Sequence, residues 1–114
     1  MNTAEFLMIA SSVVPDRTAM VCEAEPRSFM EMQDRVNRLA NAMQGLGVSQ
    51  GNKIAVMALN SMEFVEVYYA ASKLGAVFVP LNYRAKQEEI IYMCNNSEAV
   101  ALFVGDRYLD LANF

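Results

Sequence analysis

The clearest hydrophobic pattern in the chain lies between residues 28 and 47. Apolar side chains recur there three and four residues apart, which places them on one face of a helix. They are Phe29, Met32, Val36, Leu39, Ala40, Met43 and Leu46. Ser28 and Glu31 fit a capping box at the start of this helix, and Gly47 is suited to end it in a left-handed conformation.

The polar face of the same helix carries opposite charges one helical turn apart. Glu31 precedes Arg35 by four residues, and a second pair, Asp34 and Arg38, has the same spacing. Carboxylate-first pairs at this spacing stabilise helices, so we expect both ion pairs to form at the surface. We also expect the glutamates of the other predicted helices to be solvated; they are Glu63, Glu66, Glu88 and Glu89.

In the second half of the chain the pattern changes to short, continuous apolar runs separated by segments of helical length. The runs are residues 54–59, 76–81 and 99–104, and they are rich in Val, Ile and Phe without polar alternation. Strands of this kind are buried on both faces, as in a parallel sheet. The intervening residues 62–74 and 86–95 have the length of crossover helices. The pattern therefore predicts an α/β fold with an open, mainly parallel, Rossmann-like sheet and flanking helices.

Smaller elements flank this sheet. Residues 1–14 predict a surface helix and not a secretory signal, because no Lys or Arg precedes the apolar stretch. Residues 19–22 and 27–30 predict a small β-hairpin around a turn at 23–26. After the last strand, Asp106 is placed to cap a further helix, but no Gly or Pro ends it before the chain stops. We therefore expect residues 1–114 to be a single, partial domain.

Polar residues follow each of the three predicted strands. They are Asn60 and Ser61, then Asn82, Tyr83 and Arg84, then Gly105, Asp106 and Arg107. Ligands of open α/β sheets bind at these strand ends. Asn60 or Ser61, and also Asp106, are suited to cap the helices that begin there, and Asn82 is suited to shape a turn. Arg84 allows two interpretations, a guanidinium that pairs with a phosphate or a solvated arginine.

Motifs of catalysis and of nucleotide binding are absent from the sequence. The glycines of residues 45–51 follow a helix and precede a strand, whereas phosphate loops follow a strand and open a helix. The chain has no histidine, so the commonest general base is missing. Cys22 and Cys94 lie far apart without a C-x-x-C, which excludes the common zinc spacings and a redox pair. We expect both to be buried thiols.

Composition narrows the class of protein. Hydrophobic residues make up 54% and charged residues 19%, which is typical of a folded domain and not of a disordered chain. The net charge is -4 and 9 basic residues are scattered among 13 acidic ones, so we expect no nucleic-acid partner. The apolar runs are too short to predict a membrane span. Without a secretion signal, we expect a cytoplasmic location.

Short motifs occur along nearly the whole chain. They are PDRTA at residues 15–19, SFMEM at 28–32, VNRLANA at 36–42, LGV at 46–48, GNKIA at 51–55 and YAASKLGAVFVPLNYR at 69–84. Together they resemble the start of the adenylate-forming superfamily and, within it, the acyl-CoA synthetases. SFMEM matches the threonine-tyrosine-x-glutamate-leucine motif of that family, and the last segment is the most specific.

The resemblance implies a parent enzyme that is an ATP-dependent acyl- or fatty-acid CoA ligase. Such an enzyme activates a carboxylic acid with ATP and Mg²⁺ to an acyl-adenylate and passes the acyl group to coenzyme A. The family's phosphate loop with its lysine, its aromatic-Gly-Thr-Glu stretch, its ribose-binding Asp and its carboxyl-terminal lysine would all lie downstream of Phe114. We therefore expect this chain alone to be inactive and to bind none of these cofactors tightly. One position carries over: the resemblance places Arg84 near the nucleotide end of CoA.

Two other hypotheses remain at this point. The high apolar fraction of a short chain suggests exposed apolar faces, so the chain is alternatively a free-standing, non-catalytic interaction module of the same fold. Such a module would self-associate or bind a partner through its apolar face. A small nucleotide-binding domain acting alone is the third hypothesis, and it lacks the support of a phosphate loop.

Overall fold

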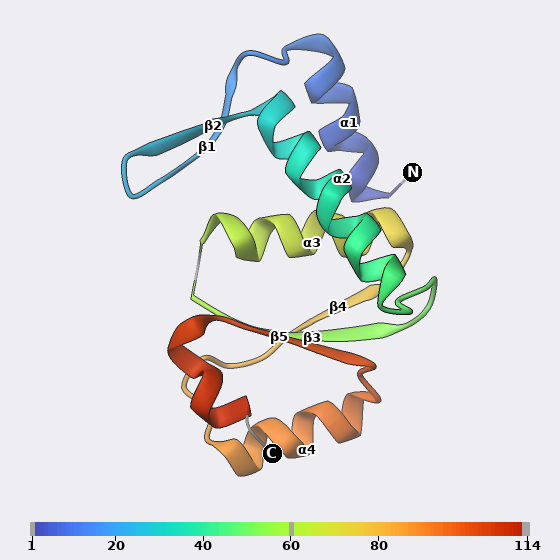
Figure 1. Ribbon diagram of the computed structural model, residues 1–114, viewed down its shortest axis with the longest axis vertical. Coiled ribbons are helices and arrows are strands. Elements are labelled where there is room, and N and C mark those ends of the chain that lie inside the picture. Colours follow the sequence, from blue (N-terminus) through green and yellow to red (C-terminus); the bar gives the residue numbers. More distant parts are fainter. Residues whose placement is uncertain (1, 60, 113–114) are drawn as a thin grey trace.

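A three-stranded parallel sheet lies between two groups of helices (Figure 1). The computed structural model describes residues 2–59 and 61–112. Strand β3 (Lys53–Met57) is the centre of the sheet, with β4 (Val77–Pro80) on one side and β5 (Ala101–Val104) on the other. Both neighbours run parallel to β3, and Val56 is in register with Pro80 and with Phe103. The predicted open, parallel, Rossmann-like sheet is confirmed.

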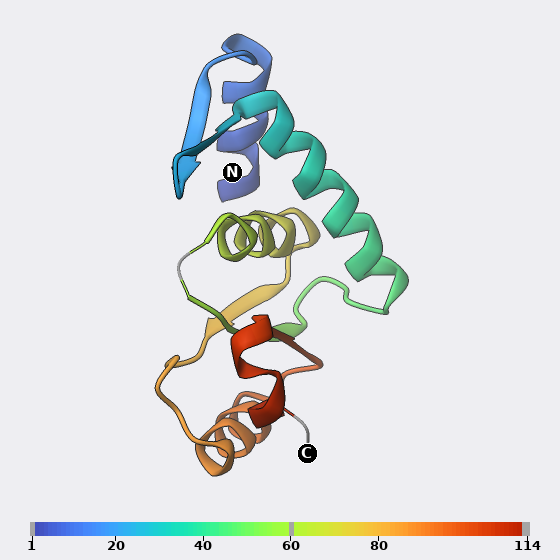
Figure 2. The same ribbon diagram turned by 60° about the vertical axis from the view of Figure 1, so that its left-hand side comes forward.

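Helices cover both faces of this sheet. Helix α3 (Met62–Leu74) connects β3 to β4 on one face, and α4 (Gln87–Ser97) connects β4 to β5 on the other. Helices α1 (Thr3–Val13) and α2 (Phe29–Gly45) pack on α3 and form a further layer (Figure 2). After β5, the 3-10 helix η1 (Asp106–Ala112) packs against α4. The further helix predicted at Asp106 is therefore present, as a 3-10 helix.

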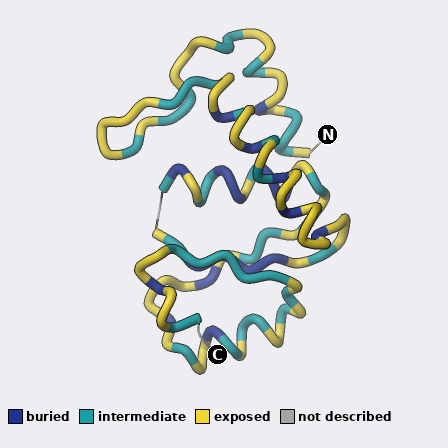
Figure 3. The backbone as a smooth tube through the Cα atoms, viewed as in Figure 1, coloured by how far each residue is buried: buried dark blue, intermediate teal, exposed yellow. Residues whose placement is uncertain are grey.

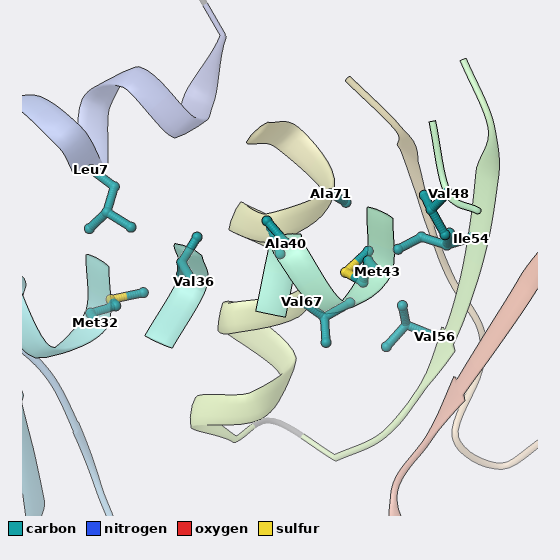
Figure 4. Packing of buried hydrophobic residues seen from close by; sticks show 11 residues of the cluster. Leu7, Met32, Val36, Ala40, Met43, Val48, Ile54, Val56, Val67 and Ala71 are labelled. Atoms are coloured by element: carbon teal, nitrogen blue, oxygen red, sulfur yellow. The ribbon is translucent and has the colours of Figure 1, made fainter. Parts of the chain in front are cut away.

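The larger hydrophobic core lies between α1, α2, α3 and one face of the sheet (Figure 4). Helix α2 contributes the buried Met32, Val36, Ala40 and Met43, as its three-and-four spacing predicts. Leu46 was expected on the same stripe, but it is 80% exposed. The helix ends at Gly45, and Leu46 is the cap residue, so its side chain no longer follows the helical face.

The second core lies between the other face of the sheet and α4 with η1. Ala55 and Met57 of β3 contact this core, whereas Ile54 and Val56 belong to the first, as the alternation of side chains along a strand requires. The prediction that all three strands are buried on both faces holds for β3 alone. Strands β4 and β5 each have one strand neighbour and are only partly buried (Figure 3).

The hairpin of β1 (Thr18–Cys22) and β2 (Glu25–Ser28) projects from the body of the molecule (Figure 1). Its turn consists of Glu23 and Ala24, with φ of 51° and 67°. Two left-handed residues give a turn whose twist suits adjacent antiparallel strands. The predicted second strand at 27–30 is wrong in its bounds, because the turn is two residues long and α2 begins directly after Ser28.

The start of α2 is held by the predicted capping box. The Ser28 hydroxyl accepts a hydrogen bond from the Glu31 amide at 3.1 Å, and the Glu31 carboxylate accepts one from the Ser28 amide at 2.9 Å. A cap of this kind contributes about 1 kcal/mol. At the other end, Gly47 has a φ of +96°, which confirms the predicted left-handed stop.

The two ion pairs expected on α2 have different outcomes. Arg38 and Asp34 form the predicted surface pair at 3.0 Å. The prediction of a pair between Glu31 and Arg35 is wrong. The Glu31 carboxylate accepts from the Ser28 amide in the capping box, and Arg35 binds a residue of α3 instead. Arg35 Nε donates to Glu66 Oε1 at 2.7 Å. Glu66 was expected to be solvated, yet it is only 4% exposed, because its face of α3 packs against α2.

Cys22 and Cys94 are free, and each is half-buried. The expectation that both thiols are buried is therefore met only in part. Burial raises the pKa of the Cys94 thiol above its ordinary value.

The length and composition of the helices also bear on membrane insertion. Among residues 2–59 and 61–112, no helix is long and apolar enough to cross a membrane.

Candidate functional site

A hollow of about 450 Å³ opens at the carboxyl ends of β3 and β5, beside the start of α3. Apolar side chains form most of its lining, with Phe64 of α3 and Phe103 of β5 among them. The polar side chains of the lining are Ser61, Glu63 and Asp106. Two of the three predicted strand ends therefore meet in one concave site, at the edge where an open α/β sheet binds its ligands.

Ser61 is the N-cap of α3. Its hydroxyl accepts a hydrogen bond from the Phe64 amide at 3.2 Å, and its carbonyl accepts one from the Val65 amide at 3.4 Å. The predicted capping role of Ser61 is thus confirmed, and its hydroxyl oxygen is already engaged. Asn60, the other candidate at this strand end, lies outside the described residues.

The charge of the hollow disfavours a phosphate. Glu63 and Asp106 contribute carboxylates, and the described residues of the lining include no Lys or Arg. A nucleotide phosphate placed there would meet like charges without a compensating cation.

Clusters of metal-binding side chains are a further feature of a candidate site. In the described part of the chain, no group of three or more His, Cys, Asp or Glu side chains is able to hold a metal ion.

The carboxyl end of β4 carries the third group of predicted residues. Asn82 shapes the turn as expected: its side-chain oxygen accepts from the Arg84 amide at 2.9 Å, and its carbonyl accepts from the Ala85 amide at 3.0 Å. The Arg84 side chain is exposed, and its guanidinium carbon lies 5.4 Å from the centre of the Tyr83 ring. Strand β3 separates β4 from β5, and Arg84 is not part of the hollow's lining.

The sequence did not reveal the ion pair between Arg35 and the buried Glu66. Both residues line a second hollow of about 340 Å³ between α2 and α3, which shares Glu63 and Val67 with the first. The hydrogen bond from Arg35 to Glu66, and the negative charge of that carboxylate, raise the pKa of Arg35. One signal in the sequence points to this burial: residues 62–74 are apolar nearly all round, so a glutamate in this helix has little solvent-facing surface to occupy.

An apolar groove of about 290 Å³ runs between α1, β1, α2 and α3. Its lining consists of Phe6, Leu7, Ala19, Met20, Phe29, Met32, Val65 and Tyr69. Beside it, α1 also exposes Met8, Ile9 and Val13. This is the apolar surface that the interaction-module hypothesis requires.

Comparison with known proteins gives a consistent result. Residues 9–113 match the profile of a family described as AMP-binding enzyme. The chain is 33% identical over 110 residues to a 3-oxocholest-4-en-26-oate–CoA ligase of Rhodococcus rhodochrous, an alignment that covers 96% of this chain. It is 38% identical over 97 residues, 85% of this chain, to a 2-succinylbenzoate–CoA ligase of Bacillus cereus.

A solved structure shares the fold along nearly the whole chain. The inhibitor-bound N-terminal domain of FACL13 from Mycobacterium tuberculosis superimposes with a TM-score of 0.93 at 28% identity and covers 98% of this chain. The chain spans 29% of that domain and 20% of the length of each of the two curated ligases. The resemblance therefore concerns the first part of proteins that are several times longer.

Proposed function

Because the chain belongs to the AMP-binding enzyme family, we propose that it is the amino-terminal part of an ATP-dependent acyl- or fatty-acid CoA ligase. In this proposal, residues 1–114 are the start of the large amino-terminal domain of that enzyme. The observation that carries it is the alignment of 96% of this chain with 20% of a CoA ligase at 33% identity. The expected cytoplasmic location belongs to the same proposal.

The proposed parent reaction has two steps. The carboxylate of the acid attacks the α-phosphorus of ATP, which gives an acyl-adenylate and releases pyrophosphate. The CoA thiolate then attacks the acyl carbon, which gives the thioester and releases AMP. Mg²⁺ bound with ATP would stabilise the negative charge that develops on the phosphate oxygens in the first step.

The chain alone is proposed to be inactive. Adenylation needs groups that stabilise charge on the transferred phosphate, and such groups supply much of the catalysis in reactions of this class. The hollow at the strand ends offers Glu63 and Asp106 instead. In the parent, the residues of this chain would form part of the scaffold that positions later catalytic segments.

Arg84 is proposed to bind the nucleotide end of CoA in the parent enzyme. Its guanidinium is exposed at a strand end, and the neighbouring Tyr83 ring lies under it without neutralising its charge. In the longer enzyme, Arg84→Met should raise KM for CoA several-fold and leave KM for ATP and for the acid unchanged. Arg38→Met is the matched control, because Arg38 is also exposed but lies on α2 and pairs with Asp34.

The alternative, a non-catalytic module that self-associates, is supported by the exposed apolar side chains of α1. Phe6 is 58% exposed and Val13 is 72% exposed. Sedimentation velocity of the purified chain measures whether it dimerises. This result distinguishes the module from the ligase fragment only when ligase activity is measured as well. A dimer that dissociates on Phe6→Ser, from a reading frame that ends at Phe114, would favour the module.

Acid-dependent exchange of labelled pyrophosphate into ATP tests the proposed function. The assay is run on the 114-residue chain and on the protein encoded by the complete reading frame, with CoA-thioester formation followed in parallel. We expect both activities in the longer protein and neither in the chain. Turnover by the 114-residue chain would contradict its proposed inactivity, and a longer protein without either activity would contradict the ligase proposal.

A further inference from the structure

The connection between β4 and α4 is a turn that is fixed at both ends (Figure 1). The side chains of Leu81 and Ala85 are buried in the second core. The Leu81 amide donates to the Val56 carbonyl at 2.8 Å, which holds the start of the turn on β3. Inside the turn, the Asn82 side-chain oxygen accepts from the Arg84 amide at 2.9 Å. The backbone therefore fixes the position from which the Arg84 side chain extends.

The exposed side chains of this turn are basic and aromatic. Tyr83 and Arg84 are exposed, and so is Lys86, the N-cap of α4. Residues 81–86 contain no Asp or Glu. The next carboxylates along the chain are those of Glu88 and Glu89 in the first turn of α4, and Glu89 accepts from the Lys86 amide at 3.2 Å. The turn is therefore locally basic, unlike the acidic hollow at the ends of β3 and β5.

The Arg84 guanidinium contacts an aromatic ring instead of a carboxylate. Its carbon lies over the Tyr83 ring, 5.4 Å from the ring centre. The Arg38 guanidinium, in contrast, binds the carboxylate of Asp34 at 3.0 Å. A ring face attracts a cation through its quadrupole and neutralises none of its charge. The N–H groups of Arg84 therefore keep their capacity to bind phosphate oxygens in bidentate geometry.

The contact with the ring also restricts the Arg84 side chain. A free arginine side chain has several rotatable bonds and loses that freedom when it binds a ligand. A guanidinium that is already held over a ring loses less freedom on binding, so the same phosphate contact gives a higher affinity. Tyr83 belongs to neither of the two hydrophobic cores of the described residues, so the ring is not needed for their packing.

We propose that Tyr83 is a positioning residue, whose ring holds the Arg84 guanidinium where it binds a phosphate at the nucleotide end of CoA. This inference rests on the proposed function, because it requires that Arg84 binds CoA in the longer enzyme. It goes beyond that function by assigning a role to Tyr83, which acts on CoA through Arg84. Loss of the ring therefore weakens binding only while Arg84 is present, and only of a thiol that carries the nucleotide.

Steady-state kinetics of thioester formation, on the protein from the complete reading frame, test the proposal. We expect Tyr83→Leu to raise KM for CoA about threefold, the loss of one exposed cation–π contact, and to leave kcat and KM for ATP unchanged. Tyr83→Phe keeps the ring and should keep KM for CoA. Tyr92→Leu is the matched control, because Tyr92 is also an exposed tyrosine but belongs to α4. An unchanged KM for CoA in Tyr83→Leu would overturn the proposal.

A double-mutant cycle separates positioning from direct contact with CoA. Because Tyr83 acts through Arg84, Tyr83→Leu should add nothing to the rise in KM caused by Arg84→Met. A further threefold rise in the double variant would overturn the positioning role. Pantetheine, the thiol of CoA without its nucleotide, gives the second arm, and KM for pantetheine should be the same with and without Tyr83→Leu. A threefold rise with pantetheine would also overturn the positioning role.

Chemical modification of Arg84 by phenylglyoxal, followed by peptide mass spectrometry, gives a readout that does not need ligase activity. We expect CoA to protect Arg84 from modification in the longer protein. Half-protection should require about threefold more CoA in Tyr83→Leu than in Tyr83→Phe. The same CoA concentration for half-protection in both variants would contradict the proposal.

The outcomes separate this inference from the proposed function. Protection of Arg84 by CoA that depends on Tyr83, in a longer protein without ligase activity, would support the positioning role and overturn the ligase proposal. An active ligase in which Arg84→Met raises KM for CoA and Tyr83→Leu does not would do the reverse. An active ligase in which neither variant changes KM for CoA would overturn the proposed role of Arg84 and this inference together.

Discussion

Replacing Arg35 by Met removes the cation that faces the buried carboxylate of Glu66. Arg35 Nε donates to Glu66 Oε1 at 2.7 Å, and this contact joins α2 to α3. Glu66 is 4% exposed, so its carboxylate depends on the guanidinium for most of the stabilisation that water would otherwise give. The variant therefore places an uncompensated charge between two helices of the larger core.

The expected loss of stability follows from how far the Arg35 and Glu66 side chains are buried. Breaking a fully buried ion pair costs about 3–5 kcal/mol, and an exposed pair is worth about 0–1 kcal/mol. The Glu66 side chain is 6% exposed and the Arg35 side chain 43% exposed, so water reaches the pair from one side through the adjacent hollow. We expect Arg35→Met to lower the free energy of unfolding by about 2 kcal/mol.

Urea denaturation at pH 7, followed by circular dichroism, measures this loss. Arg38→Met is the matched control, because its pair with Asp34 is 78% and 62% exposed, and we expect a change below about 0.5 kcal/mol. The double variant Arg35→Met with Glu66→Leu removes both charges and should recover at least half of the loss. Equal effects of Arg35→Met and Arg38→Met, or a double variant no more stable than Arg35→Met, would refute the reasoning.

Three further predictions follow from the caps, the core and the thiols. Ser28→Ala should cost about 1 kcal/mol in urea denaturation, since it removes the hydroxyl half of the capping box. Hydrogen bonds from the Ser28 amide and hydroxyl hold the pKa of Glu31 below its ordinary value, so this contribution to stability is present above that value and is lost as the pH falls through the lowered pKa. A carbon-detected titration of Glu31 should show that Ser28→Ala moves the pKa upward, and an unchanged pKa would contradict the hydrogen-bond assignment. Met43→Ala should lower the free energy of unfolding by about 2–5 kcal/mol, because Met43 is 1% exposed. Leu46→Ala should be nearly neutral, because Leu46 is 80% exposed. Comparable unfolding midpoints for the two variants would disprove the description of the core. Burial raises the pKa of Cys94, so its rate of alkylation by iodoacetamide, followed by mass spectrometry, should still be rising with pH above the ordinary range of a free thiol, and a plateau below pH 8.5 would contradict the burial.

The elements that the sequence predicts well are those whose signals are local. The capping box at Ser28, the left-handed Gly47 and the three-and-four spacing of α2 each depend on neighbours within one or two turns. The sheet was predictable because β3 is buried on both faces and therefore reads as a continuous apolar run. Helix α3 was predicted with its observed bounds, since it is covered by helices on one side and by the sheet on the other.

What the sequence could not predict depends on contacts between distant segments. The sequence places the Glu31 carboxylate one helical turn before Arg35, and only the packing of α2 on α3 decides that Arg35 binds Glu66 instead. The hairpin turn at Glu23 and Ala24 carries none of the Gly or Asn signals that left-handed residues usually have.

The candidate site was predicted in part. Ser61 follows β3 and Asp106 follows β5, and because these strands are neighbours both residues line the same hollow. Arg84 follows β4, which lies on the other side of β3. The order of strands in the sheet decides this separation, and the sequence does not contain that order. The role of Arg84 in binding CoA stays a prediction.

Reading the coding DNA beyond the codon for Phe114 tests the central claim most directly, because every functional proposal depends on a longer polypeptide. The account predicts an open frame about four times as long again as this chain, which encodes a Ser/Thr/Gly-rich loop with a lysine. A stop codon directly after Phe114 would contradict the account, and the exposed apolar surface of α1 would then be the feature to explain.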